Sequence, residues 1–302
     1  MIIKDTTENL RLSEIVVILG NFDGIHRGHN LLVEKAKQIG LENGLKTAVL
    51  TFAPHPLKVF VGEEFRLIYT EEEKIALFAE IGLDYYILFP FTEEHRNMSP
   101  DSFIQDILLD KLGVRAVVVG SDYHFGKKAA GNAAMLKEVL MTKGITVEVM
   151  EKLQDHGQDI SSTRLRSAIQ TGNLKEFEEL TGRHFHIRGK VRDGQKLGRT
   201  IGFPTANLIP DSDKMLPPNG VYLSEVIYQG QAYRGLSNIG ISPSLENRPY
   251  SVETFILNFQ EKIYGQEIEV RFLEYLRPEI SFASLEELKA QITKDVELVK
   301  AK

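Results

Sequence analysis

The chain has 302 residues, of which 42% are hydrophobic and 26% charged, a composition typical of soluble globular proteins and a length sufficient for two domains. It contains no cysteine, which excludes disulfides, thiolate metal sites and thiol nucleophiles. The formal net charge of −6 and the lack of a bilayer-length apolar run argue against a nucleic-acid-binding or membrane protein, so we expect a cytoplasmic protein.

Short apolar runs alternate with amphipathic stretches over the first 182 residues. The runs are nearly continuous and rich in β-branched residues, which is typical of strands buried on both faces of a sheet. They predict strands at Ile15–Leu19, Thr47–Phe52, Asp84–Phe89, Arg115–Val119 and Thr146–Val149. Strands that alternate with helices favour a doubly wound, Rossmann-like parallel sheet, which binds ligands at the carboxyl ends of its strands.

Capping residues mark the helices between these strands. Thr70 and Glu73 form a capping-box pattern, and Gly82 is the expected C-cap of the same helix. Ser99 followed by Pro100 is a typical helix start. These and similar signals predict helices over residues 70–82, 99–113, 132–144 and 173–182.

The pattern changes to strands and turns after Gly182. A hairpin is predicted around Gln229-Gly230-Gln231, and Ser251–Phe259 with Glu267–Leu273 suggests a second hairpin. Closely spaced strands of this kind predict a small antiparallel β-barrel, which the helix capped by Ser284 and Glu287 would close. We therefore expect an α/β domain over residues 1–182 and a β-barrel domain over residues 183–302.

The segment between the first predicted strand and the next helix carries a candidate phosphate site. Glycines let the backbone approach a ligand closely, and a helix N-terminus favours anions. Two histidines three residues apart would share one helical face and donate hydrogen bonds to phosphate oxygens. An ordinary turn with two exposed histidines is the alternative. The candidate residues are Gly20, Phe22, Asp23, Gly24, His26, Gly28 and His29.

A second segment, Ile160-Ser161-Ser162-Thr163-Arg164-Leu165-Arg166, begins another predicted helix. By itself it also fits a serine-capped helix with solvated arginines. Together, the two segments resemble the HxGH and ISSTxxR signatures of the nucleotidylyltransferase superfamily. The resemblance implies that both segments hold the phosphates of ATP, with His26, His29, Ser162, Thr163 and Arg164 as the binding residues.

The reaction that this resemblance implies is attack of a substrate phosphate on the α-phosphorus of ATP, with release of pyrophosphate. Because a phosphate monoester is already ionised at neutral pH, the step needs positioning and charge stabilisation rather than a base. Gly120–Gly126 resembles the GxDFxFG segment of a flavin-adenylylating branch, although Tyr123 and His124 depart from it and receive no role. We expect Asp122 to contact ATP, and the candidate flavin contacts are Pro54, His55, Pro56 and Phe125. Phe91 is better explained as a buried aromatic residue.

A second glycine-rich segment lies near the start of the β-rich half of the chain. Its glycines make a loop able to fold over phosphates, and hydroxyl and amide oxygens suit Mg²⁺. A proline-containing turn with capping side chains explains the same residues equally well. The candidate ATP contacts are Gly194, Gly198, Gly202, Phe203, Pro204, Thr205 and Asn207, with Thr205 and Asn207 as magnesium ligands.

The segment Gly198–Leu208 resembles the PTAN motif of riboflavin kinases, which sits in a small β-barrel. The matching strand of that family carries a catalytic carboxylate, which implies that Glu253 is the general base for a neutral alcohol. Leu273, Arg277 and Phe282 resemble the flap over the flavin ring. Two positions depart from the family pattern: Asn258 stands where the family has Asp, and Ser242-Pro243-Ser244 stands where it has Arg-Pro-Thr. These differences affect details of the flavin contacts.

Both motif sets, in this order, resemble the bacterial bifunctional riboflavin kinase/FAD synthetase family over nearly the whole chain. The resemblance implies conversion of riboflavin to FMN and of FMN to FAD, with Mg²⁺, ATP, ADP and pyrophosphate as the other participants. Two alternatives stay open, a single-activity adenylyltransferase with a degenerate barrel and a non-catalytic flavin or nucleotide sensor. The sequence leaves the oligomeric state open.

Overall fold

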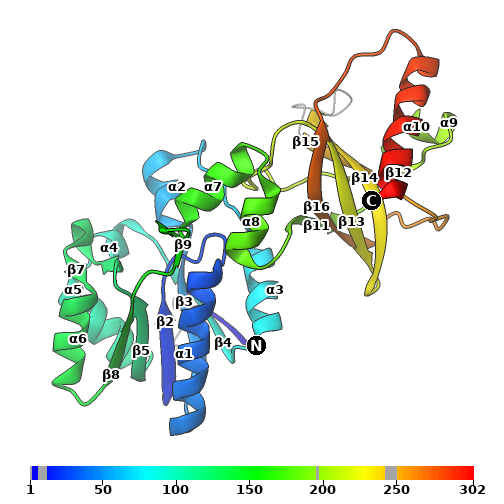
Figure 1. Cartoon of the computed structure of the whole chain (residues 1–302). Helices are drawn as coiled ribbons and strands as arrows, with labels where there is room; N and C mark the ends of the chain where they lie inside the picture. Colours follow the sequence, from blue (N-terminus) through cyan, green and yellow to red (C-terminus); the bar gives the residue numbers. More distant parts are fainter. Residues whose placement is uncertain (1, 6–11, 195–196, 242–249) are drawn as a thin grey trace. The chain divides into compact units, whose positions relative to one another are not determined.

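The computed structural model describes residues 2–5, 12–194, 197–241 and 250–302. Packing divides the chain into two compact units, residues 1–162 and residues 163–302. Figure 1 shows an α/β arrangement in the first unit and a β-rich arrangement in the second.

The first unit is built on a six-stranded parallel sheet in the order β1-β4-β3-β2-β5-β8. The predicted parallel, Rossmann-like sheet is confirmed, and β1 is an additional edge strand that the apolar pattern did not reveal. The strands are β1 (Ile2–Asp5), β2 (Ile15–Leu19), β3 (Lys46–Ala53), β4 (Tyr85–Pro90), β5 (Val114–Gly120) and β8 (Thr146–Met150).

Helices cover both faces of this sheet, as a doubly wound fold requires. Alternate residues of β2 explain why its run is apolar throughout: Ile15, Val17 and Leu19 join the core on one face, while Val16 lies towards α1 on the other. The helices are α1 (Arg27–Asn43), α2 (Pro56–Val61), α3 (Glu71–Ile81), α4 (Glu93–Arg96), α5 (Pro100–Ser102) and α6 (Ala133–Met141).

The helix ends follow the capping residues. Thr70 accepts a hydrogen bond from the Glu73 backbone and Glu73 accepts one from the Thr70 backbone, which is the predicted capping box. The segment predicted as one helix after Ser99 is instead the single turn α5 followed by a π-helix (Phe103–Lys111). A π-helix closes wider turns than an α-helix, and apolar periodicity does not distinguish the two.

The second unit contains a six-stranded antiparallel sheet in the order β11-β16-β13-β14-β15-β12. Its two edges meet where Arg192 bridges Asn207, so the sheet curls towards a barrel. The strands are β11 (Phe185–Lys190), β12 (Thr205–Leu208), β13 (Gly220–Tyr228), β14 (Gln231–Ile241), β15 (Tyr250–Ile256) and β16 (Glu267–Arg277). The helices are α7 (Ser162–Gln170), α8 (Leu174–Thr181), α9 (Leu197–Thr200) and α10 (Leu285–Ala301).

The pairing of β15 and β16 corrects the prediction of a second hairpin. β13 and β14 form the expected hairpin, but β15 pairs with β14 and β12, whereas β16 pairs with β13 and β11. Both segments alternate correctly for strands, so their local pattern does not identify their partners. The segment 242–244, where the family pattern is broken, lies outside the described residues.

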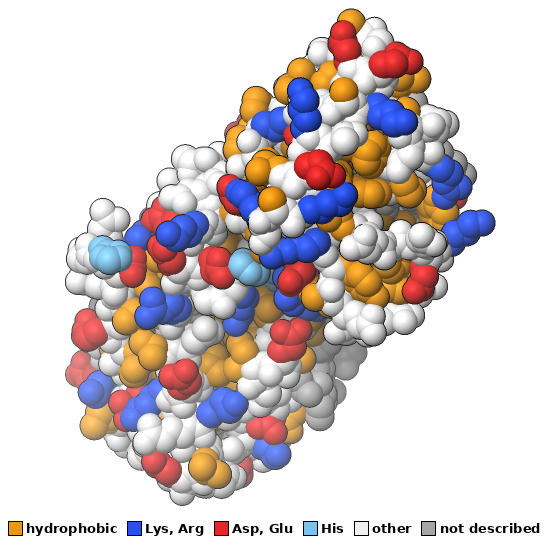
Figure 2. Space-filling model, turned by 45° about the vertical axis from the view of Figure 1, so that its right-hand side comes forward, with side chains coloured by type: hydrophobic (Ala, Val, Ile, Leu, Met, Phe, Trp, Pro, Cys, Tyr) orange, Lys and Arg blue, Asp and Glu red, His pale blue; other side chains and the backbone are white. Residues whose placement is uncertain are grey.

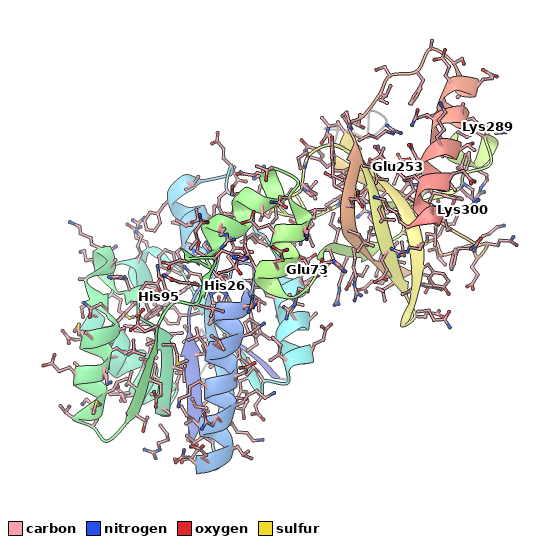
Figure 3. The ribbon with its side chains drawn as sticks, in the orientation of Figure 1. His26, Glu73, His95, Glu253, Lys289 and Lys300 are labelled. Atoms are coloured by element: carbon pink, nitrogen blue, oxygen red, sulfur yellow. The ribbon has the colours of Figure 1, made fainter. Side chains whose placement is uncertain are left out.

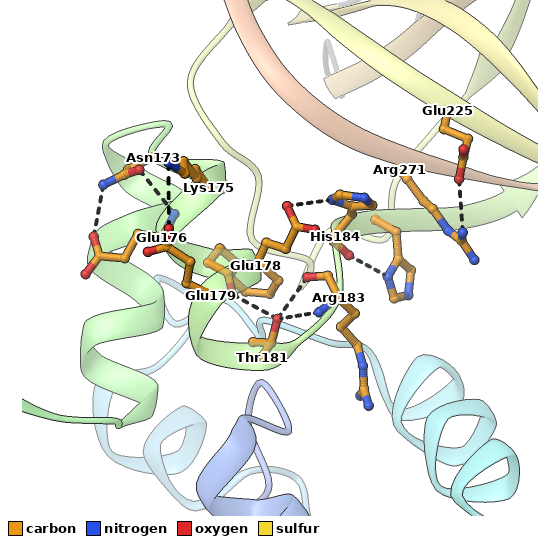
Figure 4. Close-up of polar contacts among 12 residues, drawn as sticks. Asn173, Lys175, Glu176, Glu178, Glu179, Thr181, Arg183, His184, Glu225 and Arg271 are labelled. Atoms are coloured by element: carbon orange, nitrogen blue, oxygen red, sulfur yellow. Dashed lines mark hydrogen bonds and ion pairs between the residues drawn. The ribbon is translucent and has the colours of Figure 1, made fainter. Parts of the chain in front are cut away.

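Helix α8 and strand β11 join through a short polar connection (Figure 4). Asn173 caps α8, and Gly182 ends it in the left-handed conformation, as predicted. The Thr181 hydroxyl oxygen lies 2.8 Å from the Phe177 carbonyl oxygen and 2.9 Å from the Arg183 carbonyl oxygen, so its single proton can be donated to either. The ring contact between Phe177 and Phe185, 5.5 Å between centroids, then packs α8 against the start of β11.

Acidic and basic side chains are interspersed over the face drawn in Figure 2. Within the described part of the chain, no helix is both long and apolar enough to cross a membrane.

Candidate active sites

The first unit contains a cavity of about 620 Å³ at the carboxyl ends of its strands. Its wall includes the last residues of β2, β5 and β8 and the second-last residues of β3 and β4, at the edge where a doubly wound sheet binds ligands. The paired histidines are part of this wall. The aromatic part of the wall is formed by Phe52, Phe60, Phe89, Phe91, Phe103, Tyr123 and Phe125.

His26 and His29 lie together at the N-terminus of α1, where Figure 3 labels His26. Their rings stack with centroids 3.7 Å apart, and His26 Nδ1 accepts a hydrogen bond from the His29 backbone at 3.3 Å. This contact leaves Nε2 of a neutral His26 as the hydrogen-bond donor. His29 Nδ1 has no hydrogen-bond partner among the described residues. Both residues line the cavity, and His29 Nδ1 is a buried nitrogen whose hydrogen-bonding capacity is unused within the described residues.

Burial keeps the two histidines uncharged. It lowers the pKa of His26 to about 4, although the carboxylates of Asp122 and Asp23 oppose the shift. Burial also lowers the pKa of His29 well below its ordinary value, with His26 as a second cause. At neutral pH the pair consequently provides hydrogen-bond donors and acceptors rather than positive charge.

The loop before α1 has the close contacts that its glycines predict. A Cβ at Gly20 would lie 2.9 Å from the Phe22 ring, and one at Gly28 would lie 3.1 Å from His26 Nδ1. Gly24 has a φ of 96°, and Phe22 has a φ of 51° although it carries a side chain. Backbone conformations of this kind persist where surrounding contacts fix them, as occurs in ligand-binding loops.

Two of the predicted ATP contacts brace this loop. The Asp23 carboxylate accepts a hydrogen bond from the Ile68 backbone at 2.9 Å, and Asp23 is not among the cavity-lining residues. Ser162 does line the cavity, and its hydroxyl donates to the Asp23 carbonyl at 2.6 Å. Thr163 and Arg164 belong to the second compact unit, where Arg164 pairs with Glu176 at 2.7 Å.

The predicted flavin contacts divide into two groups. Pro56 and Phe125 line the cavity, whereas Pro54 and His55 are not among its lining residues. His55 instead caps α2, because its Nδ1 accepts a hydrogen bond from the Leu57 backbone at 3.1 Å. Asp122 lines the cavity and pairs with Lys152 at 3.2 Å.

The second unit contains a cavity of about 270 Å³ between the sheet, α9 and α10. Apolar side chains form much of the wall, and Glu253 lies on β15 (Figure 3). Burial raises the pKa of the Glu253 carboxyl above its ordinary value, which strengthens it as a base. The predicted site residues that line this cavity are Gly198, Phe203, Thr205, Glu253, Arg277 and Phe282.

Strand register brings the polar side chains of this site to one face. Asn207 lies opposite Glu253 on the neighbouring strand, and Asn238 lies opposite Glu253 on its other side. Directly opposed residues of antiparallel strands point to the same face of a sheet. Asn207 is buried, and its amide nitrogen is 3.4 Å from the Thr205 hydroxyl. The two predicted magnesium ligands are therefore adjacent.

Gly194 and Gly198 lie close to these residues. A Cβ at Gly194 would lie 2.5 Å from the Asn207 amide nitrogen, and one at Gly198 would lie 2.3 Å from the Phe203 carbonyl oxygen. Gly202 has a φ of 94°. The hydroxyl and amide oxygens of Thr205 and Asn207 suit Mg²⁺, which takes few protein ligands together with substrate phosphates. Gly194, Pro204, Asn207 and Leu273 are not themselves lining residues of the cavity.

Two family models match the chain, FAD synthetase over residues 8–164 and riboflavin kinase over residues 181–302. The bifunctional riboflavin kinase/FMN adenylyltransferase of Listeria monocytogenes is 37% identical over 93% of this chain and 90% of its own length. The proteins of the same name from Escherichia coli and Bacillus subtilis are 36% and 37% identical, each again over 93% of this chain. The chain belongs to this family.

A solved structure from Streptococcus pneumoniae, described as a macrolide-efflux protein, also resembles this member of the bifunctional family. The two chains are 30% identical, superpose with a TM-score of 0.88, and each is covered over 99% of its length. The likeness therefore extends over both compact units.

The structure of this bifunctional family member adds site residues that sequence reasoning missed. Phe60 and Phe91 line the first cavity, with Phe91 against Phe52 at 5.7 Å between ring centroids. Phe91, which the sequence predicts as a buried aromatic residue, is only half-buried and lines the cavity. Lys128 lines the same cavity, and Glu279 lines the second. No local motif singles out these side chains, because the fold brings them to the cavities from separate loops.

Proposed function

We propose that the chain carries out both reactions of its family, phosphorylation of riboflavin to FMN with ATP and adenylylation of FMN to FAD with release of pyrophosphate. The observation that carries the proposal is that each unit holds a cavity lined by its own motif residues, His26 and His29 in one and Thr205 and Glu253 in the other. Family membership over both halves supports the same assignment.

For adenylylation, the substrate phosphate attacks the α-phosphorus of ATP and pyrophosphate leaves. The attacking oxygen is already ionised, so no residue has to remove a proton. The uncharged His26 and His29 would donate hydrogen bonds to phosphate oxygens as charge develops on them. The glycine loop and the N-terminus of α1 would hold the phosphates in place.

For phosphorylation, Glu253 would accept the proton of the riboflavin hydroxyl while the hydroxyl oxygen attacks the γ-phosphorus of ATP and ADP leaves. A carboxyl whose pKa is raised is better matched to this task than an ordinary glutamate. Bound Mg²⁺ would supply charge neutralisation of the phosphates, and Thr205 and Asn207 would hold it. The apolar wall of the second cavity suits the flat flavin ring.

We further propose that the adenylyltransferase comprises residues 1–182 and the kinase residues 183–302. Packing assigns most of α7 and all of α8 to the second unit, whereas the FAD synthetase match ends at residue 164. Neither family match covers residues 165–180, so the assignment of this segment to the adenylyltransferase is part of the proposal. Cytoplasmic location stays a prediction.

The direct test is incubation of the full chain with riboflavin, ATP and Mg²⁺, followed by chromatographic separation of riboflavin, FMN and FAD. We expect FMN to appear first and FAD to follow. FAD from supplied FMN without FMN from riboflavin would indicate a single-activity adenylyltransferase. Flavin binding without either product would indicate a sensor, and omission of Mg²⁺ should abolish phosphorylation.

A further inference from the structure

A short turn at the wall of the first cavity holds a lysine in an unfavourable backbone conformation. The turn joins β6 (His124–Phe125) to β7 (Gly131–Asn132), which pair as a small antiparallel ladder. Lys128 has φ 54° and ψ 30°, and Ala129 has φ 56°. Residues with a Cβ rarely adopt this left-handed conformation, so surrounding contacts must fix the turn.

Those contacts are present on both sides of the turn. The Lys127 backbone donates to the Met98 carbonyl at 2.8 Å, and the Ala129 backbone donates to the Gly126 carbonyl at 3.0 Å. A Cβ at Gly126 would lie 2.9 Å from the Pro100 ring, so no side chain fits between them. The turn is therefore fixed on the segment before the π-helix, and Lys128 is held at the cavity wall.

The positive charge of Lys128 is not balanced by a neighbouring carboxylate. The cations that line the cavity are Arg96, Lys128 and Lys152. Lys152 pairs with Asp122 at 3.2 Å and Asp159 at 3.4 Å, and Arg96 lies 3.9 Å from Glu93. Over the described ranges, the Lys128 ammonium makes neither a hydrogen bond nor an ion pair. Its charge is thus available to a ligand.

The chemistry of this cavity needs such a charge. A nucleoside triphosphate and a flavin phosphate together bring several negative charges, while the histidines that face them are uncharged. Lys128 is exposed at the cavity wall, and a phosphate bound in the cavity would displace part of the water that screens its charge. Lys128 supplies a positive charge where the buried histidines do not.

We propose that Lys128 is a substrate-binding residue of the adenylyl-transfer cavity, where its ammonium binds a phosphate group of the substrates. The inference rests on the proposed adenylyltransferase function and names a contact outside the two signature segments. The phosphate belongs either to FMN or to the triphosphate that leaves as pyrophosphate. The left-handed turn serves to present the ammonium to that group.

The test uses the full chain and compares Lys128→Ala with Lys127→Ala. Lys127 is the matched control, because it is an exposed lysine on the same turn that does not line the cavity. We expect Lys128→Ala to raise a KM of FAD formation by roughly tenfold, the effect of losing a charge-assisted hydrogen bond. A rise in the KM for FMN identifies the flavin phosphate. A rise for ATP, and for pyrophosphate in the reverse reaction, identifies the triphosphate.

Two further variants separate ligand binding from a structural role. Lys128→Gly relieves the left-handed strain and should leave the melting temperature unchanged or higher, yet raise the same KM as Lys128→Ala. Lys128→Arg should retain most of the affinity. The inference would be overturned if the KM values of Lys128→Ala and Lys128→Gly both stayed within twofold of wild type. It would also be overturned if Lys127→Ala raised the KM as much as Lys128→Ala does. A wild-type chain that makes no FAD would overturn the proposed function as well.

Discussion

The proposed catalytic residues of the two sites differ because the two acceptor groups, a phosphate and an alcohol, differ in acidity. His26 and His29 are buried and uncharged, which suits an acceptor phosphate that is already an anion. Glu253 has a raised pKa, which suits an acceptor alcohol that must lose a proton. The contrast makes single substitutions selective, because each should affect one reaction and leave the other intact.

His29→Ala should abolish most FAD formation and leave FMN formation unchanged. Loss of a hydrogen-bond donor to charge that develops in the transition state costs about 3–4 kcal/mol, a rate loss on the order of a hundredfold or more. Both rates are measured at saturating ATP and flavin. His156→Ala, an exposed histidine of the same unit, is the control. A normal FAD rate in His29→Ala would refute the role of His29.

Glu253→Gln should lower riboflavin phosphorylation by roughly 10²–10⁴-fold and leave FAD formation from supplied FMN near wild type. Only the ionised carboxylate of Glu253 can accept the proton. The kinase activity of the wild-type chain should therefore fall as the pH drops through the pKa of Glu253, and because that pKa is raised, the fall should begin at a higher pH than for an ordinary glutamate. The pH profile of kcat/KM measures this. If excess ATP and Mg²⁺ restored full turnover to Glu253→Gln, the residue would orient ligands rather than act as the base.

Among the secondary-structure elements, β16 and α10 are joined by an ion pair between the half-buried Arg277 and the buried Asp295. Arg277 contacts the Asp295 carboxylate through Nε at 3.0 Å and through Nη2 at 2.6 Å, and Gln291 donates to the same carboxylate. Both charged residues line the second cavity. The pair therefore fixes the closing helix beside the proposed flavin site.

Asp295→Ala should lower the free energy of unfolding of the second unit by about 2 kcal/mol, because it leaves the charge of the half-buried Arg277 without its partner. Urea unfolding of the full chain measures the change. Glu297→Ala on the same helix is the control, since its pair with Lys300 is largely exposed and should contribute less than about 1 kcal/mol. Equal effects of the two substitutions would show that the Arg277–Asp295 contact does not anchor α10.

The elements also show how far the sequence predicts the fold and the sites. Apolar runs and caps identify β2 and the capping box of α3 because both signals are local. The partner of β15 depends on contacts distant in sequence, which local alternation does not encode. Asp23 carries a carboxylate suited to a ligand, yet its hydrogen bond to the Ile68 backbone is visible only in the fold.

At the scale of the whole molecule, the two activities should separate with the two units. The fragment Thr163–Lys302 should convert riboflavin to FMN and make no FAD. It keeps α8, whose Phe177 packs against Phe185 at the start of β11. Arg183–Lys302 should have the same activity with lower stability, because it exposes that face. Product chromatography and thermal melts measure both, and a folded Thr163–Lys302 without kinase activity would contradict autonomous function.

The order of strands in the second sheet also bears on how the chain is made in the cell. Within the residues that the structure describes, β11 lies at an edge of the sheet and pairs with β16, which is the last of the described strands to be synthesised. The sheet of the second unit therefore cannot be completed until the ribosome has nearly finished the chain, whereas all six strands of the first sheet are translated earlier. The nascent protein would thus acquire its adenylyltransferase fold while its kinase fold is still incomplete.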